Sequence, residues 1–169
     1  METPVDLRAQ LETSHAASFA WALNCCAWDH AEAEEVLQTV YVKVLQGKAV
    51  YNGRAAFRTW LFSVIRNTAR GRRRWNLLRR RRVLPLHEPS PAADSRPGPA
   101  EAAVDRQVAA RLRTALAALP RRQREVLHLV FYQDLSVADA AAVIGVSVGS
   151  ARTHYERGKR QLRRLMEAP

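Results

Sequence analysis

The sequence predicts an all-α protein made of two small helical domains that are joined by a Pro-rich flexible linker. Apolar residues recur at helical spacing in segments on both sides of residues 83–100. No segment shows the sustained alternation of apolar and polar residues that is typical of a half-buried strand. The segment 83–100 itself holds five prolines, and proline removes the backbone N–H that a helix interior needs. Helices on either side of such a segment predict two separate folding units.

The proline-rich segment also places the domain boundaries. Ser, Ala and Gly accompany its prolines, and this composition favours a flexible connection over a packed core. We therefore predict a first domain over residues 1–82, a linker over residues 83–104 and a second domain over residues 105–169. Both domains lie within the usual size range of roughly 50–250 residues.

Three helical segments are predicted in the first domain. Residues 5–27 contain no helix breaker. The next segment carries one apolar stripe, formed by Val36, Leu37, Val40, Tyr41, Val44 and Leu45. Gly47 ends this helix and residues 51–53 form a turn. The apolar face of the third segment is formed by Phe57, Trp60, Leu61, Val64 and Ile65, which places both aromatic residues in the core. This helix continues into an arginine-rich end, where Gly71 weakens it.

The second domain begins with a helical pattern from about Glu101 to Leu119. Pro120 fits the first turn of the following helix, because its missing N–H has no helical partner there. The buried face of that helix is predicted at Val126, Leu127, Val130 and Phe131.

The most specific local pattern predicts a helix-turn-helix at residues 136–166. Ser136 is placed to cap a short helix, and Asp139 completes a capping box. Gly145 supplies the left-handed backbone conformation that a tight turn between helices requires. Ser147 is the expected N-cap of a second helix that runs to about Met166.

The second helix of this motif has an apolar and a basic face. The inward residues are expected to be Val148, Ala151, Tyr155, Leu162 and Leu165. The outward residues are Ser150, Arg152, Thr153, His154, Arg157, Lys159 and Arg160. Small polar groups at the start of a helix allow a close approach to base edges in the major groove, and arginine binds phosphate or guanine. The alternative is an ordinary helical hairpin with a solvated basic face.

The charge of the chain indicates a polyanionic partner. Lys and Arg number 27 against 16 Asp and Glu, a formal net charge of +11. Residues 66–82 hold nine arginines and no acid, whereas residues 1–45 hold seven acids and two bases. The arginine-rich end suits the phosphates of nucleic acid, and the acidic end suits a basic protein.

Several classes of protein are not expected. No nucleophile–base pair, metal-ligand set or Gly-rich phosphate loop is visible, so we expect no enzymatic activity, no metal and no cofactor. No stretch reaches the roughly 20 apolar residues of a membrane span, and the N-terminus lacks the pattern of a signal peptide. We therefore expect no membrane insertion and a cytoplasmic location. The adjacent Cys25 and Cys26 are expected to be reduced residues in or near the core, and a thiol sensor is the alternative.

Two runs of residues carry a family resemblance. The first comprises residues 32–38 (EAEEVLQ), 57–61 (FRTWL) and 65–67 (IRN). The second comprises residues 118–127 (ALPRRQREVL), 135–136 (LS) and 144–150 (IGVSVGS). In this order they resemble regions 2 and 4 of the sigma-70 family of bacterial RNA polymerase sigma factors, in its extracytoplasmic function (ECF) type.

The resemblance implies that the chain directs core RNA polymerase to specific promoters and initiates transcription. Region 2 would dock on a coiled coil of the largest polymerase subunit through Glu34, Glu35 and Gln38, and Thr39 stands where the family often has an acid. Region 2 would also recognise and melt the minus-ten promoter element. The residues implied in that role are Tyr51, Asn52, Arg66, Asn67, Arg70, Arg72, Arg73 and Arg74.

Region 4 would recognise the minus-thirty-five element through the helix-turn-helix. The residues implied there are Ser147, Ser150, Arg152, Thr153, His154, Arg157 and Arg160. The implied partners are core RNA polymerase, through its coiled coil and its flap, promoter DNA and an anti-sigma protein. The unbound chain is expected to be a monomer.

Two other classes of protein remain open from the residues alone. A dimeric operator-binding regulator would use the same helix-turn-helix on duplex DNA without a polymerase, but this gives no role to the acidic helix or to the long arginine-rich helix. A general nucleic-acid binder or RNA chaperone would bind tightly, with strong salt dependence and no sequence preference.

Overall fold

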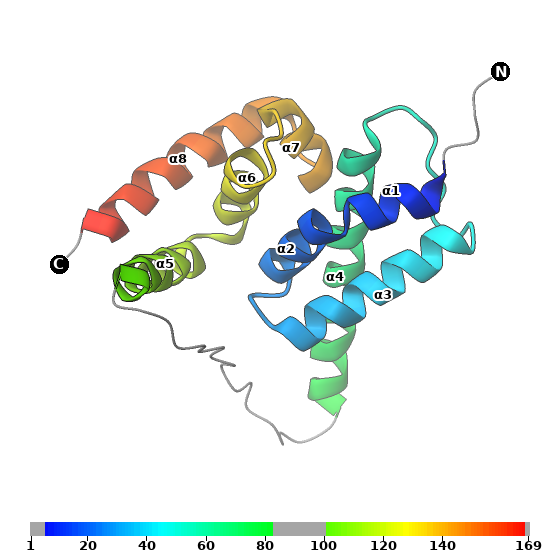
Figure 1. The fold of residues 1–169 in the computed structure, drawn as a ribbon, viewed down its shortest axis with the longest axis horizontal. Coiled ribbons are helices and arrows are strands. Elements are labelled where there is room, and N and C mark those ends of the chain that lie inside the picture. The colour runs from blue at the N-terminus through cyan, green and yellow to red at the C-terminus, as the bar shows by residue number, and fades with distance from the viewer. Residues whose placement is uncertain (1–5, 83–100, 168–169) are drawn as a thin grey trace. The chain divides into compact units, whose positions relative to one another are not determined.

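The computed structural model describes residues 6–82 and 101–167, and the regular elements of these residues are all helices (Figure 1). This confirms the all-α fold that the sequence predicts. The chain divides into two compact units, residues 1–91 and 92–169. The predicted linker, residues 83–104, lies outside the described residues up to position 100, and helix α5 occupies its last four positions. The flexibility of the linker and the predicted domain boundaries stay predictions.

The N-terminal unit is built from three helices that pack pairwise, α2, α3 and α4, with the short α1 against α2 and α3. The bounds are Leu7–Thr13 for α1, His15–Cys25 for α2, His30–Leu45 for α3 and Phe57–Arg82 for α4. The segment without breakers therefore forms two helices rather than one, because Ser14 ends the first and begins the second.

Trp21 lies at the centre of the N-terminal core. Its ring is fully buried, and its indole N–H donates to the backbone carbonyl of Phe62 at 2.9 Å. The largest side chains buried with it come from α3 and α4 and are Val36, Val40, Val44, Leu61, Phe62 and Ile65. Since one face of α3 and one face of α4 are used in this way, the opposite faces are left for solvent or for a partner.

The C-terminal unit packs α6, α7 and α8 pairwise and places α5 against α8. The bounds are Glu101–Ala118 for α5, Arg121–Phe131 for α6, Val137–Ile144 for α7 and Val148–Glu167 for α8. A cluster of apolar residues joins α5, α6 and α8, and its members are Leu112, Leu116, Leu119, Leu127, Tyr155, Leu162 and Leu165. Pro120 is the N-cap of α6, one position before the predicted first turn.

The predicted helix-turn-helix is confirmed at α7 and α8. Ser136 Oγ accepts a hydrogen bond from the backbone N–H of Asp139 at 3.0 Å, which caps α7. Gly145 ends α7 with a left-handed backbone, φ +66°. Ser147 Oγ accepts from the backbone N–H of Ser150 at 3.1 Å and caps α8. The guanidinium of Arg122 on α6 donates to the carbonyl of Ile144 at 2.6 Å and so satisfies the end of α7.

Three residues that the apolar spacing assigns to the core are exposed instead. Leu45, Phe131 and Val148 expose 60%, 56% and 43% of their surface. Leu45 and Phe131 are the last residues of α3 and α6, and Val148 is the first residue of α8. The apolar spacing therefore continues to the ends of these helices, past the turns that a neighbouring helix covers.

Gly158 marks the closest approach of α8 to α6. A Cβ at this position would lie 3.0 Å from Leu127 Cδ1 and 3.2 Å from Gln123 Cβ. Because Leu127 is in the core and Gln123 Cβ is attached to the α6 backbone, we expect Gly158→Ala to force the two helices apart. The free energy of unfolding should fall by about 1–2 kcal/mol, measured by urea unfolding followed by circular dichroism.

Gly149→Ala is the matched control on the same helix, since its Cβ would meet only Ser147 Oγ at 4.0 Å. It should leave the stability unchanged or raise it by up to about 1 kcal/mol, because alanine is the better helix former. Equal losses from the two substitutions would contradict the close packing of α6 on α8.

His128 on α6 is buried, and burial lowers the pKa of its imidazole from the ordinary value to about 4. Between pH 4 and pH 6.5 the unfolded chain therefore binds a proton that the folded chain does not. We expect the free energy of unfolding to fall as the pH drops through this window, by up to roughly 3 kcal/mol. Urea unfolding at a series of pH values should show a steeper loss for the unmodified chain than for His128→Gln. Parallel pH profiles would rule out this role for His128.

Candidate nucleic-acid and docking interfaces

The residues that the sequence assigns to base recognition lie on helix α8 and at its N-cap, and most of them are exposed. Ser147, Ser150, Arg152, Thr153, Arg157 and Arg160 are exposed, and His154 is half-buried. The small residues at the start of the helix already bond locally: the Ser147 hydroxyl donates to Ser150 Oγ at 2.9 Å, and the Thr153 hydroxyl donates to the Gly149 carbonyl at 3.0 Å. The start of α8 is therefore a compact polar surface, and exposed arginines follow it in the next turns of the helix.

The arginine-rich part of α4 divides into buried and exposed positions. Asn67, Arg73 and Arg74 are exposed and Arg70 is half-buried. Arg66 is only 2% exposed, so the expectation that it faces DNA is wrong. The reason is its helical position: Arg66 lies four residues after Phe62 and adjacent to Ile65, on the stripe by which α4 packs into the core.

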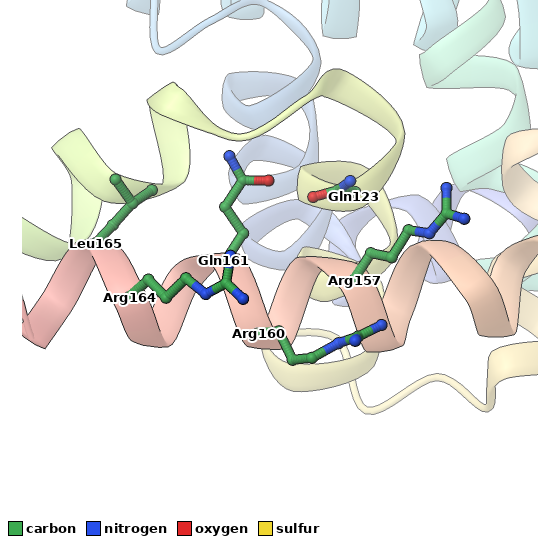
Figure 2. A pocket seen from close by; sticks show the side chains of 6 residues that line it. All are labelled: Gln123, Arg157, Arg160, Gln161, Arg164 and Leu165. Carbon is green, nitrogen blue, oxygen red and sulfur yellow. The ribbon is translucent and has the colours of Figure 1, made fainter.

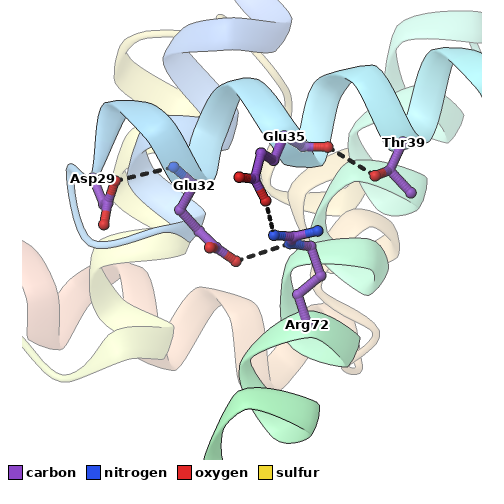
Figure 3. A network of polar contacts seen from close by, with 5 residues as sticks. All are labelled: Asp29, Glu32, Glu35, Thr39 and Arg72. Carbon is purple, nitrogen blue, oxygen red and sulfur yellow. Dashed lines mark hydrogen bonds and ion pairs between the residues drawn. The ribbon is translucent and has the colours of Figure 1, made fainter. Parts of the chain in front are cut away.

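Arg72 connects α4 to α3 through two ion pairs (Figure 3). Its Nε lies 3.0 Å from Glu32 Oε1, and a second guanidinium nitrogen contacts the Glu35 carboxylate. The hydrogen bond with Glu32 raises the pKa of Arg72 above its ordinary value. The carboxylate of Asp29 accepts from the Glu32 backbone N–H at 3.0 Å, which fixes the start of α3. The charge of Arg72 is thus paired within the N-terminal unit, whereas among residues 6–82 and 101–167 no ion pair is formed by the exposed Arg73 and Arg74.

The exposed face of α3 changes in character along the helix. Glu34 and Gln38 are exposed, and within residues 6–82 and 101–167 Glu34 has no ion pair. In the next turns Val42 and Leu45 are exposed by 49% and 60%. Val42 and Leu45 lie four and seven residues after Gln38, so they share the exposed face of α3 with Glu34 and Gln38. The sequence analysis does not assign them to this face, although their spacing indicates it. The face is acidic in its first half and apolar in its second.

The loop before α4 is held by an aromatic cluster. The Tyr51 hydroxyl donates to the Ala55 carbonyl at 2.6 Å, and the ring centroid of Tyr51 lies 5.4 Å from that of Phe57 and 5.3 Å from that of Trp60. The sequence places Phe57 and Trp60 in the core, but both are half-buried in this cluster, so that prediction is wrong. Asn52 is exposed, and its side chain accepts from the Arg54 backbone N–H at 3.2 Å. Of the two loop residues, Asn52 faces solvent and Tyr51 supports the loop.

The described residues show neither a metal cluster nor a membrane-spanning helix. Residues 6–82 and 101–167 contain no group of three or more His, Cys, Asp or Glu side chains that could hold a metal ion. In this described part of the chain no helix is both long and apolar enough to cross a membrane. Cys25 and Cys26 are half-buried and form no disulfide. The candidate sites are three exposed surfaces: α8, the exposed positions of α4, and the outer face of α3.

Comparison with known proteins matches both units. The family model described as Sigma-70 region 2 matches residues 14–82, and that described as Sigma-70, region 4 matches residues 109–162. The ECF RNA polymerase sigma factor SigX of Bacillus subtilis is 30% identical over 141 residues, covering 82% of this chain and 73% of SigX. The ECF RNA polymerase sigma factor SigL of Mycobacterium tuberculosis is 30% identical over 163 residues, covering 95% and 89%.

Solved structures are similar in fold. The sigma factor RpoE from Bartonella quintana, determined in complex with the anti-sigma factor NepR, has a TM-score of 0.78 at 21% identity over 96% of this chain and 98% of RpoE. CnrH, determined in complex with the cytosolic domain of CnrY, has a TM-score of 0.63 at 24% identity over 94% and 86%.

The ion pairs of Arg72 yield a test of its structural role. We expect Arg72→Ala to lower the free energy of unfolding by about 1 kcal/mol, because it releases α3 from α4 and leaves two carboxylates close together. The neighbouring Arg73→Ala removes the same charge from an exposed position and should change stability by less than about 0.5 kcal/mol. Urea unfolding at low and high salt compares them, and the difference should shrink as salt screens the pairs. Identical effects of the two variants would show that the pairs contribute nothing.

Proposed function

We propose that this chain, which belongs to the sigma-70 family of RNA polymerase sigma factors and to its ECF type, directs core RNA polymerase to specific promoters and initiates transcription there. One observation carries the proposal: a region 2 match and a region 4 match occur in this order, each on a helical unit with its own core. The chain supplies recognition, and the phosphodiester chemistry belongs to the polymerase.

The C-terminal unit is the proposed reader of the minus-thirty-five element. The start of α8 enters the major groove, where Ser147, Ser150 and Thr153 allow a close approach and Arg152 forks onto a base or a phosphate. The exposure of these residues on one helix supports this assignment. The half-buried His154 and the arginines at 157 and 160 complete the proposed surface.

The N-terminal unit is the proposed reader of the minus-ten element. Asn52, Asn67, Arg70, Arg73 and Arg74 are its proposed contacts to DNA, since they reach solvent while Tyr51, Arg66 and Arg72 make contacts inside the unit. Arginine neutralises phosphate and stacks on unpaired bases, which suits a surface that holds a melted strand. Capture of such bases offsets the few kcal/mol that unstacking each step costs.

The outer face of α3 is the proposed docking surface for core RNA polymerase. Glu34 and Gln38 offer a charge and an amide to a basic coiled coil, and Val42 and Leu45 add apolar surface in the same line. Glu35 shares this face but is already bound to Arg72. Docking raises the effective concentration of both DNA-reading units at one promoter, so neither unit needs high affinity alone.

The similar proteins support two further parts of the proposal. RpoE of Bartonella quintana and CnrH were both solved with a protein partner, the anti-sigma factor NepR and the cytosolic domain of CnrY. We propose that an anti-sigma protein likewise holds this chain until its signal arrives, that the unbound chain is a monomer, and that it works in the cytoplasm, where the polymerase acts.

In vitro transcription with purified core RNA polymerase tests the function directly. Promoter-specific RNA that requires both the chain and the core enzyme is the expected product. Electrophoretic mobility with and without the core enzyme separates the competing classes of protein. Specific binding to duplex DNA by the chain alone would indicate an operator-binding regulator, and tight binding without sequence preference would indicate a general nucleic-acid binder.

Glu34→Lys tests the docking face. Reversing this exposed charge should weaken the binding of core RNA polymerase about tenfold, roughly 1.4 kcal/mol, because the face then repels a basic partner. Glu12→Lys makes the same reversal on α1, where no docking contact is proposed, and should leave the affinity close to that of the unmodified chain. Fluorescence anisotropy of the labelled chain, titrated with core enzyme, measures both. An unchanged affinity of Glu34→Lys would remove Glu34 from the docking face.

A further inference from the structure

The last turns of α4 carry a cluster of exposed apolar side chains. Trp75, Leu77 and Leu78 expose 57%, 54% and 55% of their surface, and these three residues are called the α4 apolar cluster below. They are three of the ten large apolar residues that are exposed in residues 6–82 and 101–167, yet they fall within four consecutive positions. Apolar surface that gathers in one exposed place marks a site of interaction with a protein, a ligand or a membrane.

The neighbouring helices of the N-terminal unit leave this end of α4 uncovered. From Arg73 to Arg79 every residue except the half-buried Asn76 is exposed. The first turns of α3 reach α4 at Arg72, through its two ion pairs. Figure 1 shows the last turns of α4, in green, running on past the start of α3. The cluster therefore lies beyond the part of α4 that packs in the core.

Arginines surround the cluster, and no acid lies among them. Residues 66–82 hold nine arginines and neither Asp nor Glu. Arg73, Arg74 and Arg79 are exposed, and none of them forms an ion pair with another described residue. The guanidinium of Arg79 lies 4.7 Å from the centroid of the Trp75 ring. Because arginine can keep its apolar stem against such a ring while its charge reaches an anion, the cluster combines exposed apolar surface with unpaired positive charge.

The basic surface of α8 is different in composition (Figure 2). Its groove of about 610 Å³ is lined by three arginines, two glutamines and one apolar residue, Leu165. Leu165 packs against the core cluster of the C-terminal unit. The α8 groove is thus a polar surface, as phosphate binding requires, whereas the basic end of α4 also exposes a tryptophan and two leucines.

This combination is typical of a helix that lies on an anionic bilayer. Trp75 and Leu78 are three positions apart, so they share one side of the helix. Tryptophan is enriched at the level of the lipid headgroups, and leucine gains free energy at the boundary with the acyl chains. Arginines beside them are attracted to the negative surface of a membrane that contains anionic lipids. The apolar residues and the charges therefore complement the same partner.

We propose that the end of α4 binds the surface of an anionic phospholipid bilayer. The α4 apolar cluster lies in the headgroup region, and the arginines around it contact lipid phosphates. The attachment is peripheral and needs no helix that crosses the membrane. It goes beyond the proposed function, which gives the three apolar residues no role. Since Arg73 and Arg74 are also proposed contacts to promoter DNA, a chain held at a membrane cannot use them on a promoter.

A single strand of nucleic acid is the competing occupant, because tryptophan also stacks on unpaired bases. The two leucines favour the bilayer. A leucine side chain has no aromatic face for a base and no donor for a phosphate, but it gains free energy by leaving water for an apolar environment. The arginines alone fit either partner.

Sedimentation with lipid vesicles tests the apolar contact. The full chain, without polymerase or DNA, is mixed with vesicles of equal parts phosphatidylglycerol and phosphatidylcholine, or of phosphatidylcholine alone. We expect binding to the mixed vesicles that weakens as salt is added, and little binding to phosphatidylcholine. Leu78→Ala should weaken binding to the mixed vesicles about threefold to tenfold. Leu45→Ala is the matched control, since Leu45 is 60% exposed on α3, and it should keep the affinity of the unmodified chain.

Tryptophan emission reports where Trp75 lies. On the mixed vesicles the emission of the unmodified chain should shift to shorter wavelength, and brominated lipid should quench it. Trp75→Phe should bind with an affinity within about threefold of the unmodified chain, because phenylalanine is also apolar. It should lose the shift, since Trp21 is buried and Trp28 and Trp60 are half-buried outside the cluster.

Three results would overturn the proposal. Equal affinities of Leu78→Ala and Leu45→Ala for the mixed vesicles would show only the general attraction of a basic protein. An emission that does not shift on these vesicles would show that Trp75 stays in water. A larger effect of Leu78→Ala on the affinity for single-stranded DNA than on the affinity for vesicles would assign the cluster to nucleic acid.

The proposed function can fail separately. The vesicle measurements contain neither polymerase nor promoter, so a chain that initiates no transcription can still show the membrane contact. Conversely, an active sigma factor whose Leu78→Ala variant binds vesicles like Leu45→Ala would lack it. Circular dichroism spectra confirm that the variants are folded.

Discussion

The packing of α4 against α2 and α3 decides which arginines of the N-terminal unit reach solvent. Leu61, Phe62 and Ile65 bury one side of α4 around Trp21. Arg66 falls on that buried side, while Asn67 falls on another. Arg73 lies about two helical turns after Arg66 on the same side of α4, and it is exposed. The same packing brings α4 within reach of the carboxylates of α3. Whether an arginine of this helix is buried therefore depends on the side of α4 that it occupies and on its position along the helix.

Local patterns predicted the local structure well. The caps at Ser136 and Ser147 and the left-handed Gly145 depend only on residues a few positions apart, and each was found where the sequence placed it. The apolar stripe of α3 also identified the buried Val36, Val40 and Val44. Features of this kind are fixed by spacing along one helix, which a sequence displays directly.

Contacts between distant segments could not be predicted in this way. The partners of Arg72 lie 37 and 40 positions earlier in the chain, so nothing in its neighbourhood distinguishes it from Arg73. Spacing also cannot show where a covering helix stops, which is why Leu45 and Phe131 were assigned to the core. The family resemblance proposes which residues form the candidate sites. The structure then shows which of them are exposed and which are buried or paired with another residue of the chain.

Trp21 has a consequence for how the molecule can be observed. The chain has four tryptophans, Trp21, Trp28, Trp60 and Trp75, and all of them precede the C-terminal unit. Trp21 is sealed from water, whereas Trp75 is 57% exposed beside Arg79. Since the C-terminal unit contains tyrosines but no tryptophan, the tryptophan emission of the protein is an optical signal of the N-terminal unit alone. Loosening of the helix-turn-helix would be silent in that signal, while quenching of Trp75 would register the arrival of a ligand on the arginine-rich helix.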